Sequence, residues 1–278
     1  MDKKTDISGQ LANAPVWKLI IRLSIPAILA QIVNLLYNLV DRIYIGHMED
    51  VGTMAITGLG LCFPVLSLIS AFTMLIAQGG APRAAIEMGK GDIKKAEKIL
   101  GNCFLLLIVL SAILTTVFLV FGEKFLMLFG ASESTIIYAL PYLRIYVAGS
   151  VFVMISLGLN MFITTQGFTK ISMATVLIGA ICNIVFDPIF IFVFDMGVRG
   201  AALATIVSQA ISAVWVLSFL TGHKTKLRIK RENLLPDTNK HFFQIFCIPQ
   251  RFPSLLTHCR LRSVSSHTVP PDQMPGGF

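Results

Sequence analysis

The sequence predicts an all-α membrane protein, built as a lobe of six transmembrane helices. Hydrophobic residues make up 55% of the 278 residues and charged residues only 14%, which is far from the composition of a soluble domain. A helix of about 20 apolar residues crosses a hydrocarbon core of about 30 Å, and six segments reach that length. They cover residues 17–46, 53–78, 99–121, 136–165, 171–194 and 199–220.

The positive charge is unevenly divided between the connections. Placing the connections alternately on two sides of a membrane puts sixteen Lys and Arg residues on one side and three, Arg42, Lys124 and Arg199, on the other. Cytoplasmic loops of membrane proteins carry such an excess. We therefore expect a multi-pass protein of the cell membrane with both termini in the cytoplasm. Residues 78–99 are too polar to span, and we expect them along the cytoplasmic face. The net charge of +8 then reports topology, and we expect the lipid bilayer rather than nucleic acid as its partner.

Composition also divides the chain into four predicted regions. We expect residues 1–16 to be a cytoplasmic N-terminal segment, 17–220 the six-helix lobe, and 221–246 a basic cytoplasmic connector. Five of the twelve prolines follow residue 247. Residues 247–278 cannot span a membrane, and we expect an aberrant, disordered tail there.

The fifth segment contains the most informative polar residues. Asn183 and Asp187 lie within the apolar run ICNIVFDPIFIFVF and are four residues apart, so a helix places them on one face. A carboxylate in a membrane costs several kcal/mol unless it is paired, protonated or hydrated. Pro188 also leaves the carbonyl of Ile184 without its helical hydrogen bond. Together these groups predict a cation or proton site.

Further polar residues lie in the first, fourth and sixth segments. The first carries a polar stripe that ends at Asp41, and the fourth carries a second stripe and a charged side chain. Such stripes either line a wet cavity or form hydrogen bonds between helices, and both interpretations are open. The candidates for lining a cavity are Gln31, Asn34, Asn38, Arg144 and Asn160.

Alternating topology predicts that four polar residues share one depth. Counted from the outer ends of their segments, Asp41, Asp187 and Thr205 lie roughly 8–10 Å below the membrane surface at about 1.5 Å per residue, and Arg144 is near the same level. Two carboxylates close together in a low dielectric repel each other, which favours binding of a proton or another cation. The alternative is structural: an ion pair of an aspartate with Arg144, or of Asp41 with Arg42, that holds helices together.

Four ordered motifs resemble the multidrug and toxic compound extrusion (MATE) family. They are YNLVDRIYIG at 37–46, APRAAIEMGKGD at 81–92, NIVFDPIFIF at 183–192 and GVRGAALAT at 197–205, and they are most similar to the bacterial NorM, DinF and MepA-like exporters. The resemblance implies a fold of twelve helices in two pseudo-symmetric lobes, of which this chain holds the N-terminal half. It also implies efflux of cationic or amphipathic small molecules in exchange for H⁺ or Na⁺.

The resemblance further implies a cation site in this lobe. Its residues here would be Asp41, Asn183, Asp187 and Thr205, the group that the depth argument brings together. No other metal site is expected. No nucleotide-binding motif and no hydrolase motif occurs in the sequence, so we expect no cofactor besides the coupling ion, an ion gradient as the energy source, and no enzymatic activity.

The sequence departs from the family around residues 245–252, where a seventh helix would begin. Our hypothesis is a frameshift or truncation near residue 249, which translation of the other two reading frames would test. A lobe alone would be inactive unless the missing lobe or a second copy pairs with it. Two alternatives to drug antiport therefore stay open: a flippase for lipid-linked precursors, and a membrane fragment that does not transport.

Overall fold

A computed structural model describes residues 16–48, 52–222 and 225–229 of the chain. Within these residues every regular element is a helix, which confirms the predicted all-α class. Five helices are long and apolar enough to cross a membrane, and a bent pair, α5 and α6, makes the sixth span when it is counted as one. The predicted tail, 247–278, and most of the predicted N-terminal segment lie outside the described residues.

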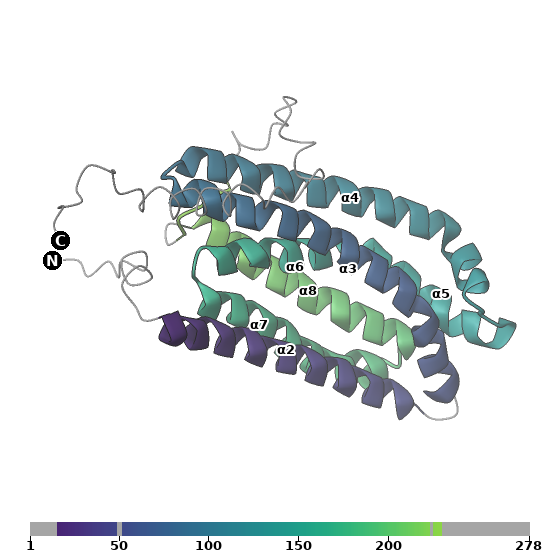
Figure 1. Cartoon of the computed structure of the whole chain (residues 1–278). Coiled ribbons are helices and arrows are strands. Elements are labelled where there is room, and N and C mark those ends of the chain that lie inside the picture. Colours follow the sequence, from purple (N-terminus) through teal and green to yellow (C-terminus); the bar gives the residue numbers. More distant parts are fainter. Residues whose placement is uncertain (1–15, 49–51, 223–224, 230–278) are drawn as a thin grey trace, which may run out of the picture.

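The helices run roughly along one common direction (Figure 1). Helix α2 (Val16–Gly46) packs along α7 (Thr169–Pro188), and α3 (Gly52–Gly89) packs along α4 (Ile93–Leu128). Helix α8 (Val198–Thr221) contacts both α6 and α7 and lies between the two outer pairs (Figure 1). The two predicted outward-running segments with an aspartate, α2 and α7, are therefore direct neighbours.

The fourth predicted span is two helices rather than one. Helix α5 (Glu133–Ala148) and helix α6 (Ser150–Thr165) meet at Gly149 with a bend of 55°. Gly149 lies against α8 so closely that a Cβ atom there would collide with the side chain of Ile206. Sharp kinks in helices commonly occur at Gly/Ser pairs, and Gly149 is followed by Ser150. Hydropathy cannot register the bend, because both halves are apolar.

The polar stretch between the second and third spans also differs from expectation. Its composition predicts a segment along the membrane face at residues 78–99, but α3 continues to Gly89 and α4 begins at Ile93. The 38 residues of α3 extend over roughly 57 Å at 1.5 Å per residue, so this helix is longer than the apolar core of a bilayer is thick. The polar residues therefore project beyond the membrane at the end of the helix.

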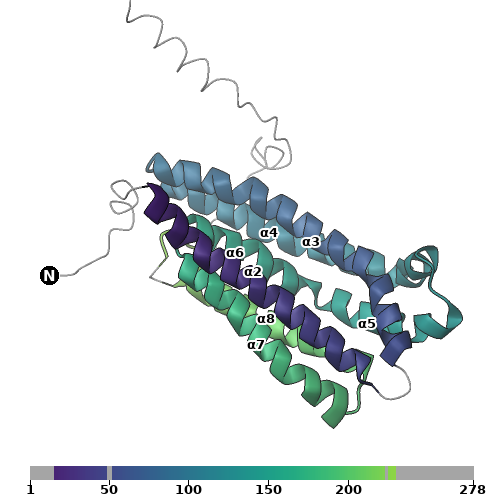
Figure 2. The same cartoon turned by 60° about the horizontal axis from the view of Figure 1, so that its bottom comes forward.

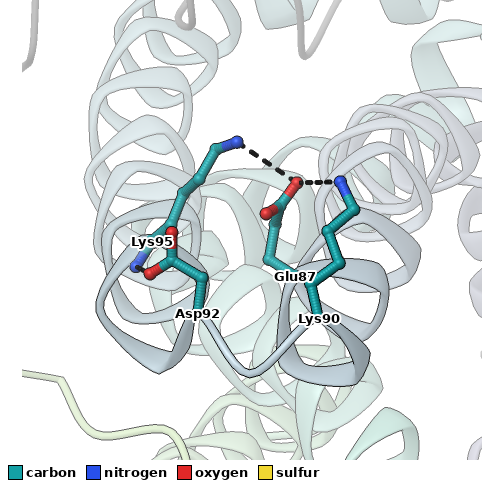
Figure 3. A network of polar contacts seen from close by, with 4 residues as sticks. All are labelled: Glu87, Lys90, Asp92 and Lys95. Atoms are coloured by element: carbon teal, nitrogen blue, oxygen red, sulfur yellow. Dashed lines mark hydrogen bonds and ion pairs between the residues drawn. The ribbon is translucent and has the colours of Figure 1, made fainter.

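The short turn between α3 and α4 is held by charged side chains (Figure 3). Glu87 accepts a hydrogen bond from Lys90 at 3.0 Å and pairs with Lys95 at 3.2 Å. Asp92 caps α4 by accepting a hydrogen bond from the backbone N–H of Lys95 at 3.0 Å. The pair of Glu87 with Lys95 crosses from one helix to the other and helps to fix the antiparallel pair at this end.

Candidate cation site

The site is built around the end of α7, where the helix changes its winding. Asp187 is followed by Pro188 and then by a single π-helical turn, η1 (Ile189–Val193), in which the N–H of Phe194 bonds to the carbonyl of Ile189 at 2.9 Å. Gly200 of α8 packs against this turn, since a Cβ atom there would collide with the carbonyl of Phe190. Single π-turns occur frequently at functional sites, and this one begins just after the carboxylate.

Asn183 connects three of the predicted residues. Its side-chain nitrogen Nδ2 donates to Asp187 Oδ1 at 3.1 Å and lies 3.5 Å from the hydroxyl oxygen of Thr205. Thr205 donates its own proton to the carbonyl of Ala201 at 3.0 Å, which leaves its oxygen free to accept. Asp187 is 0% exposed and Asn183 is 2% exposed. The predicted shared face of Asn183 and Asp187 is thus present, and Thr205 of α8 faces it.

Asp41 approaches the same group from α2. The helix lies along α7 in both views (Figures 1 and 2), and Asp41 and Asp187 are close enough for their charges to interact. Among the described residues, no ion pair joins either aspartate to an arginine or lysine. The alternative ion pairs, of an aspartate with Arg144 or of Asp41 with Arg42, are therefore not formed, although the charge of Arg42 still acts on Asp41.

Three buried oxygen atoms of this group have no hydrogen-bond partner. They are Asp41 Oδ1, Asn183 Oδ1 and Asp187 Oδ2. A buried acceptor without a partner costs roughly 1–3 kcal/mol, and more when it is charged. Carboxylate, amide and hydroxyl oxygens are the groups that bind hard cations, and a proton on one carboxylate would lower the same cost. The donor set fits either a monovalent cation or a proton.

The structure does not bring Arg144 into this group. Its side chain is exposed on α5, and no ion pair with Asp41 or Asp187 is formed. Depth counted along a helix gave the level of this residue but not the direction in which it faces. The depth of a residue in the membrane does not determine which side of its helix it lies on. In a span that is bent, as α5 and α6 are, counting residues from one end does not give that side either.

The other polar candidates are spread over two helices. Gln31 and Asn38 are exposed on α2, where Asn38 donates to the carbonyl of Asn34 at 2.6 Å. Asn160 of α6 donates to the carbonyl of Ser172 in α7 at 3.2 Å, and its own Oδ1 is buried without a partner. The contact of Asn160 joins two helices, as expected if the polar stripe forms hydrogen bonds between helices. That Gln31, Asn34, Asn38 and Asn160 line a cavity stays a prediction.

Sequence reasoning missed two tyrosines beside the aspartates. Tyr37 interacts electrostatically with both Asp41 and Asp187, and Tyr142 of α5 interacts with Asp41. Tyr37 precedes Asp41 by four residues, so the helical spacing that identified Asn183 and Asp187 would also have found it. Nothing comparable in the sequence indicates Tyr142, which reaches the site through the packing of α5.

Comparison with known proteins identifies the family of the chain. The sequence model of the MatE family matches residues 26–189, which include three of the four site residues. The chain belongs to the MatE family. It resembles the multidrug export protein MepA of Staphylococcus aureus (strain MRSA252), with 27% identity over 207 residues that cover 74% of this chain and 46% of MepA. The MepA of Staphylococcus haemolyticus (strain JCSC1435) is 25% identical over 224 residues, which are 81% of this chain and 49% of that protein.

Solved structures of MATE transporters have the same arrangement of helices. An outward-facing multidrug resistance MATE transporter of the MOP superfamily superposes with a TM-score of 0.78 at 27% identity, covering 88% of this chain and 53% of that one. A MATE structure in the bent conformation gives 0.74 at 28% identity, with coverage of 83% and 53%. The chain spans about half the length of the relatives that it matches. MATE proteins are membrane transporters, which agrees with the prediction that the chain is not an enzyme.

Proposed function

We propose that this chain forms the ion-coupling lobe of a multidrug antiporter, which exports cationic or amphipathic compounds in exchange for H⁺ or Na⁺. The relatives named above are multidrug export proteins, and coupling at an intramembrane acidic site is a common design of secondary transporters. The observation that carries the proposal is the convergence of Asp41, Asn183, Asp187 and Thr205 from three helices, with three buried oxygens left without partners.

In this mechanism a monovalent ion offsets one of the two negative charges and thereby relieves the repulsion between the two carboxylates. Asp187 and Asp41 supply the charge, and the hydroxyl oxygen of Thr205 adds a third ligand. The amide oxygen of Asn183 completes the oxygen shell once the amide has turned over, because in the structure Nδ2 is the atom that faces Asp187 and Thr205. Asp41 is the contribution of α2, which packs mainly on α7, so an ion between Asp41 and Asp187 draws the two helices together. Release of the ion would let α2 move, and bending near Pro26, inside this helix, would then change the space available to the exported compound.

A charge-neutral variant of Asp187 tests the proposal. Purified full-length chain in lipid nanodiscs is titrated with radioactive Na⁺ at several pH values, so that competition between Na⁺ and H⁺ is visible. We expect Asp187→Asn to lower the apparent affinity for the ion more than tenfold, because one of the two charges in a low-dielectric site is lost. The matched control is Asp195→Asn: Asp195 is exposed just beyond η1 and has a positive φ angle that asparagine also adopts.

Transport is measured beside binding, because the chain spans half of its relatives. Vesicles that contain this chain, or a two-lobe form in which a second MATE lobe follows it, are loaded with ethidium and given a pH or Na⁺ gradient. Ion binding without ethidium flux by this chain, together with flux by the two-lobe form, supports a coupling lobe that needs a second lobe or a second copy. Ion binding that survives Asp187→Asn, or no binding in any condition, contradicts the proposal and favours a membrane fragment without transport activity.

A further inference from the structure

The segment that leaves the lobe after α8 is fastened across one end of the helix bundle. We call residues 225–229 the exit strap. Four successive backbone N–H groups of the strap donate hydrogen bonds to other elements. Those of Lys226 and Leu227 both reach Gln166 Oε1 at 3.0 Å, that of Arg228 reaches Glu97 Oε1 at 3.3 Å, and that of Ile229 reaches the carbonyl of Leu220 at 3.2 Å.

Gln166 is the centre of this attachment. It follows the last residue of α6, and its Oε1 lies 2.7 Å from the hydroxyl oxygen of Thr225. The single proton of that hydroxyl can donate to Gln166 Oε1 or to the carbonyl of Leu227 at 2.9 Å. Its Nε2 donates to the carbonyl of Phe162 at 3.0 Å, which fixes the orientation of the amide. Gln166 is 4% exposed, Thr225 is 5% exposed and Leu227 is fully buried. Three donors therefore converge on one buried oxygen, and removing it would leave all three without this acceptor.

The attachment joins three helices that are far apart in the sequence. Glu97 lies near the start of α4, Gln166 at the end of α6, and Leu220 near the end of α8. A sliding of any one of these helices along the others would stretch bonds to the strap, because each bond has little tolerance in length and angle. A connector that only linked two domains would bond mostly to water and would make no such demand.

We propose that the exit strap is a latch that holds the ends of α4, α6 and α8 together, with Gln166 as its catch. While the latch is closed, this end of the lobe is a rigid unit, and the chain leaves the lobe at a fixed point. When the bonds to Gln166 open, the end of α6 is free to move against α4 and α8. None of the hydrogen bonds that hold the strap involves a residue of the candidate cation site, so the latch can be tested separately from it.

Hydrogen–deuterium exchange of the full chain in lipid nanodiscs tests the latch, read by mass spectrometry on peptides that cover the strap. We expect slow exchange at residues 226–229 of the unmodified chain, although no regular helix or strand contains them. Gln166→Ala should speed their exchange roughly tenfold or more, since the acceptor of two of the four amides is gone. Thr225→Val, which keeps Gln166 and the size of the side chain, should give a smaller increase.

The position of the faster exchange distinguishes a latch from a locally ordered turn. A latch predicts that Gln166→Ala also speeds exchange in the last turn of α8 and in the α6–α7 connection, whereas a turn that only caps α8 predicts a change within 225–229 alone. The matched controls are Gln78→Ala and Thr116→Val, whose side chains are exposed and bond within their own helices. Fast exchange at 226–229 in the unmodified chain overturns the proposal. An increase in exchange that is confined to residues 225–229 also overturns it. If Gln166→Ala fails to fold, Thr225→Val decides, and unchanged exchange in that variant overturns the proposal.

Discussion

A threonine in a membrane helix commonly returns its hydroxyl proton to the carbonyl one turn back, and most such contacts serve only the helix itself. Thr205 does so with Ala201, as Thr57 does with Thr53 at 2.8 Å. The difference lies in what faces the oxygen. Thr57 is exposed, whereas the oxygen of Thr205 is turned toward Asn183 and thus toward Asp187. The same local geometry therefore has a different consequence at the two positions.

We predict that Thr205→Val lowers the affinity for the coupling ion about tenfold, the effect expected for one polar contact to a charged site. Valine keeps the shape of the side chain and removes the oxygen. Na⁺ titration of the purified chain measures the effect, and Thr57→Val is the matched control, with no change expected. Equal affinities of the chain with Thr205→Val and the chain with Thr57→Val would remove Thr205 from the site.

Residue spacing predicted that Asn183 and Asp187 lie together in the candidate site, but it did not predict where Arg144 lies. Asn183 and Asp187 are four residues apart on one helix, so their shared face follows from helical geometry alone, and the cost of a carboxylate in a membrane gave a reason to expect a partner. Arg144 was expected at the same depth, and it is exposed. Depth along a helix gives no direction around it. The bend at Gly149, where Ile206 of another helix lies close, likewise leaves no trace in hydropathy.

At the scale of elements, close contact with α8 explains why a glycine occupies the bend between α5 and α6. Gly149 has an ordinary negative φ of −94°, so its backbone conformation does not require glycine. What requires glycine is the side chain of Ile206, which occupies the space that a Cβ atom would need. Glycine in a helix otherwise lowers stability relative to alanine, since it loses more conformational freedom on folding. Close approach of α8 offsets that loss here.

We predict opposite effects of the same substitution at two helical glycines. Gly149→Ala should lower the free energy of unfolding by about 1–3 kcal/mol, because the added methyl group overpacks the contact with Ile206. Gly60→Ala should raise it by up to about 1 kcal/mol, since nothing lies within 4 Å of the added Cβ atom in α3. Unfolding of the purified chain in mixed micelles with increasing dodecyl sulfate measures both. A stabilising Gly149→Ala would show that α5 and α6 can straighten without strain.

The connections between elements were the hardest part to predict. The polar stretch 78–99 reads as an amphipathic surface segment, yet it forms the ends of two long helices joined at Lys90–Asp92. Charged residues outside the apolar core of the membrane do not end a helix. Helix α3 ends near Gly91, whose positive φ of 86° is a conformation that favours glycine. The exit strap was likewise expected as part of a basic connector. Its order comes from the side chains of Gln166 and Glu97, more than a hundred residues away from it in one case.

At the scale of the whole molecule, the two ends of the helix bundle differ in charge. The turn between α3 and α4 carries Lys90 and a run of further lysines. The region after α8 carries Lys226 and Arg228 at the same end, because the backbone N–H of Arg228 bonds to Glu97 near the start of α4. Lys124 lies toward the other end of α4. An excess of Lys and Arg marks the cytoplasmic side of a membrane protein, and the sixteen-to-three division therefore predicts which end of the lobe faces the cytoplasm.

Two lysine positions at opposite ends of the helix bundle test this orientation. In a chain whose five cysteines are replaced by alanine, Lys124→Cys and Lys90→Cys each place one thiol at an exposed position. We predict that a membrane-impermeant maleimide labels the chain with Lys124→Cys in intact cells, and labels the chain with Lys90→Cys only after the cells are permeabilised. Lys124→Cys changes the division from sixteen to three to sixteen to two, and Lys90→Cys changes it to fifteen to three, so neither reverses the excess. Labelling in the reverse order would place both termini outside the cell and the cation site nearer the cytoplasm. The proposed exchange would then have to move the ion outward and the compound inward.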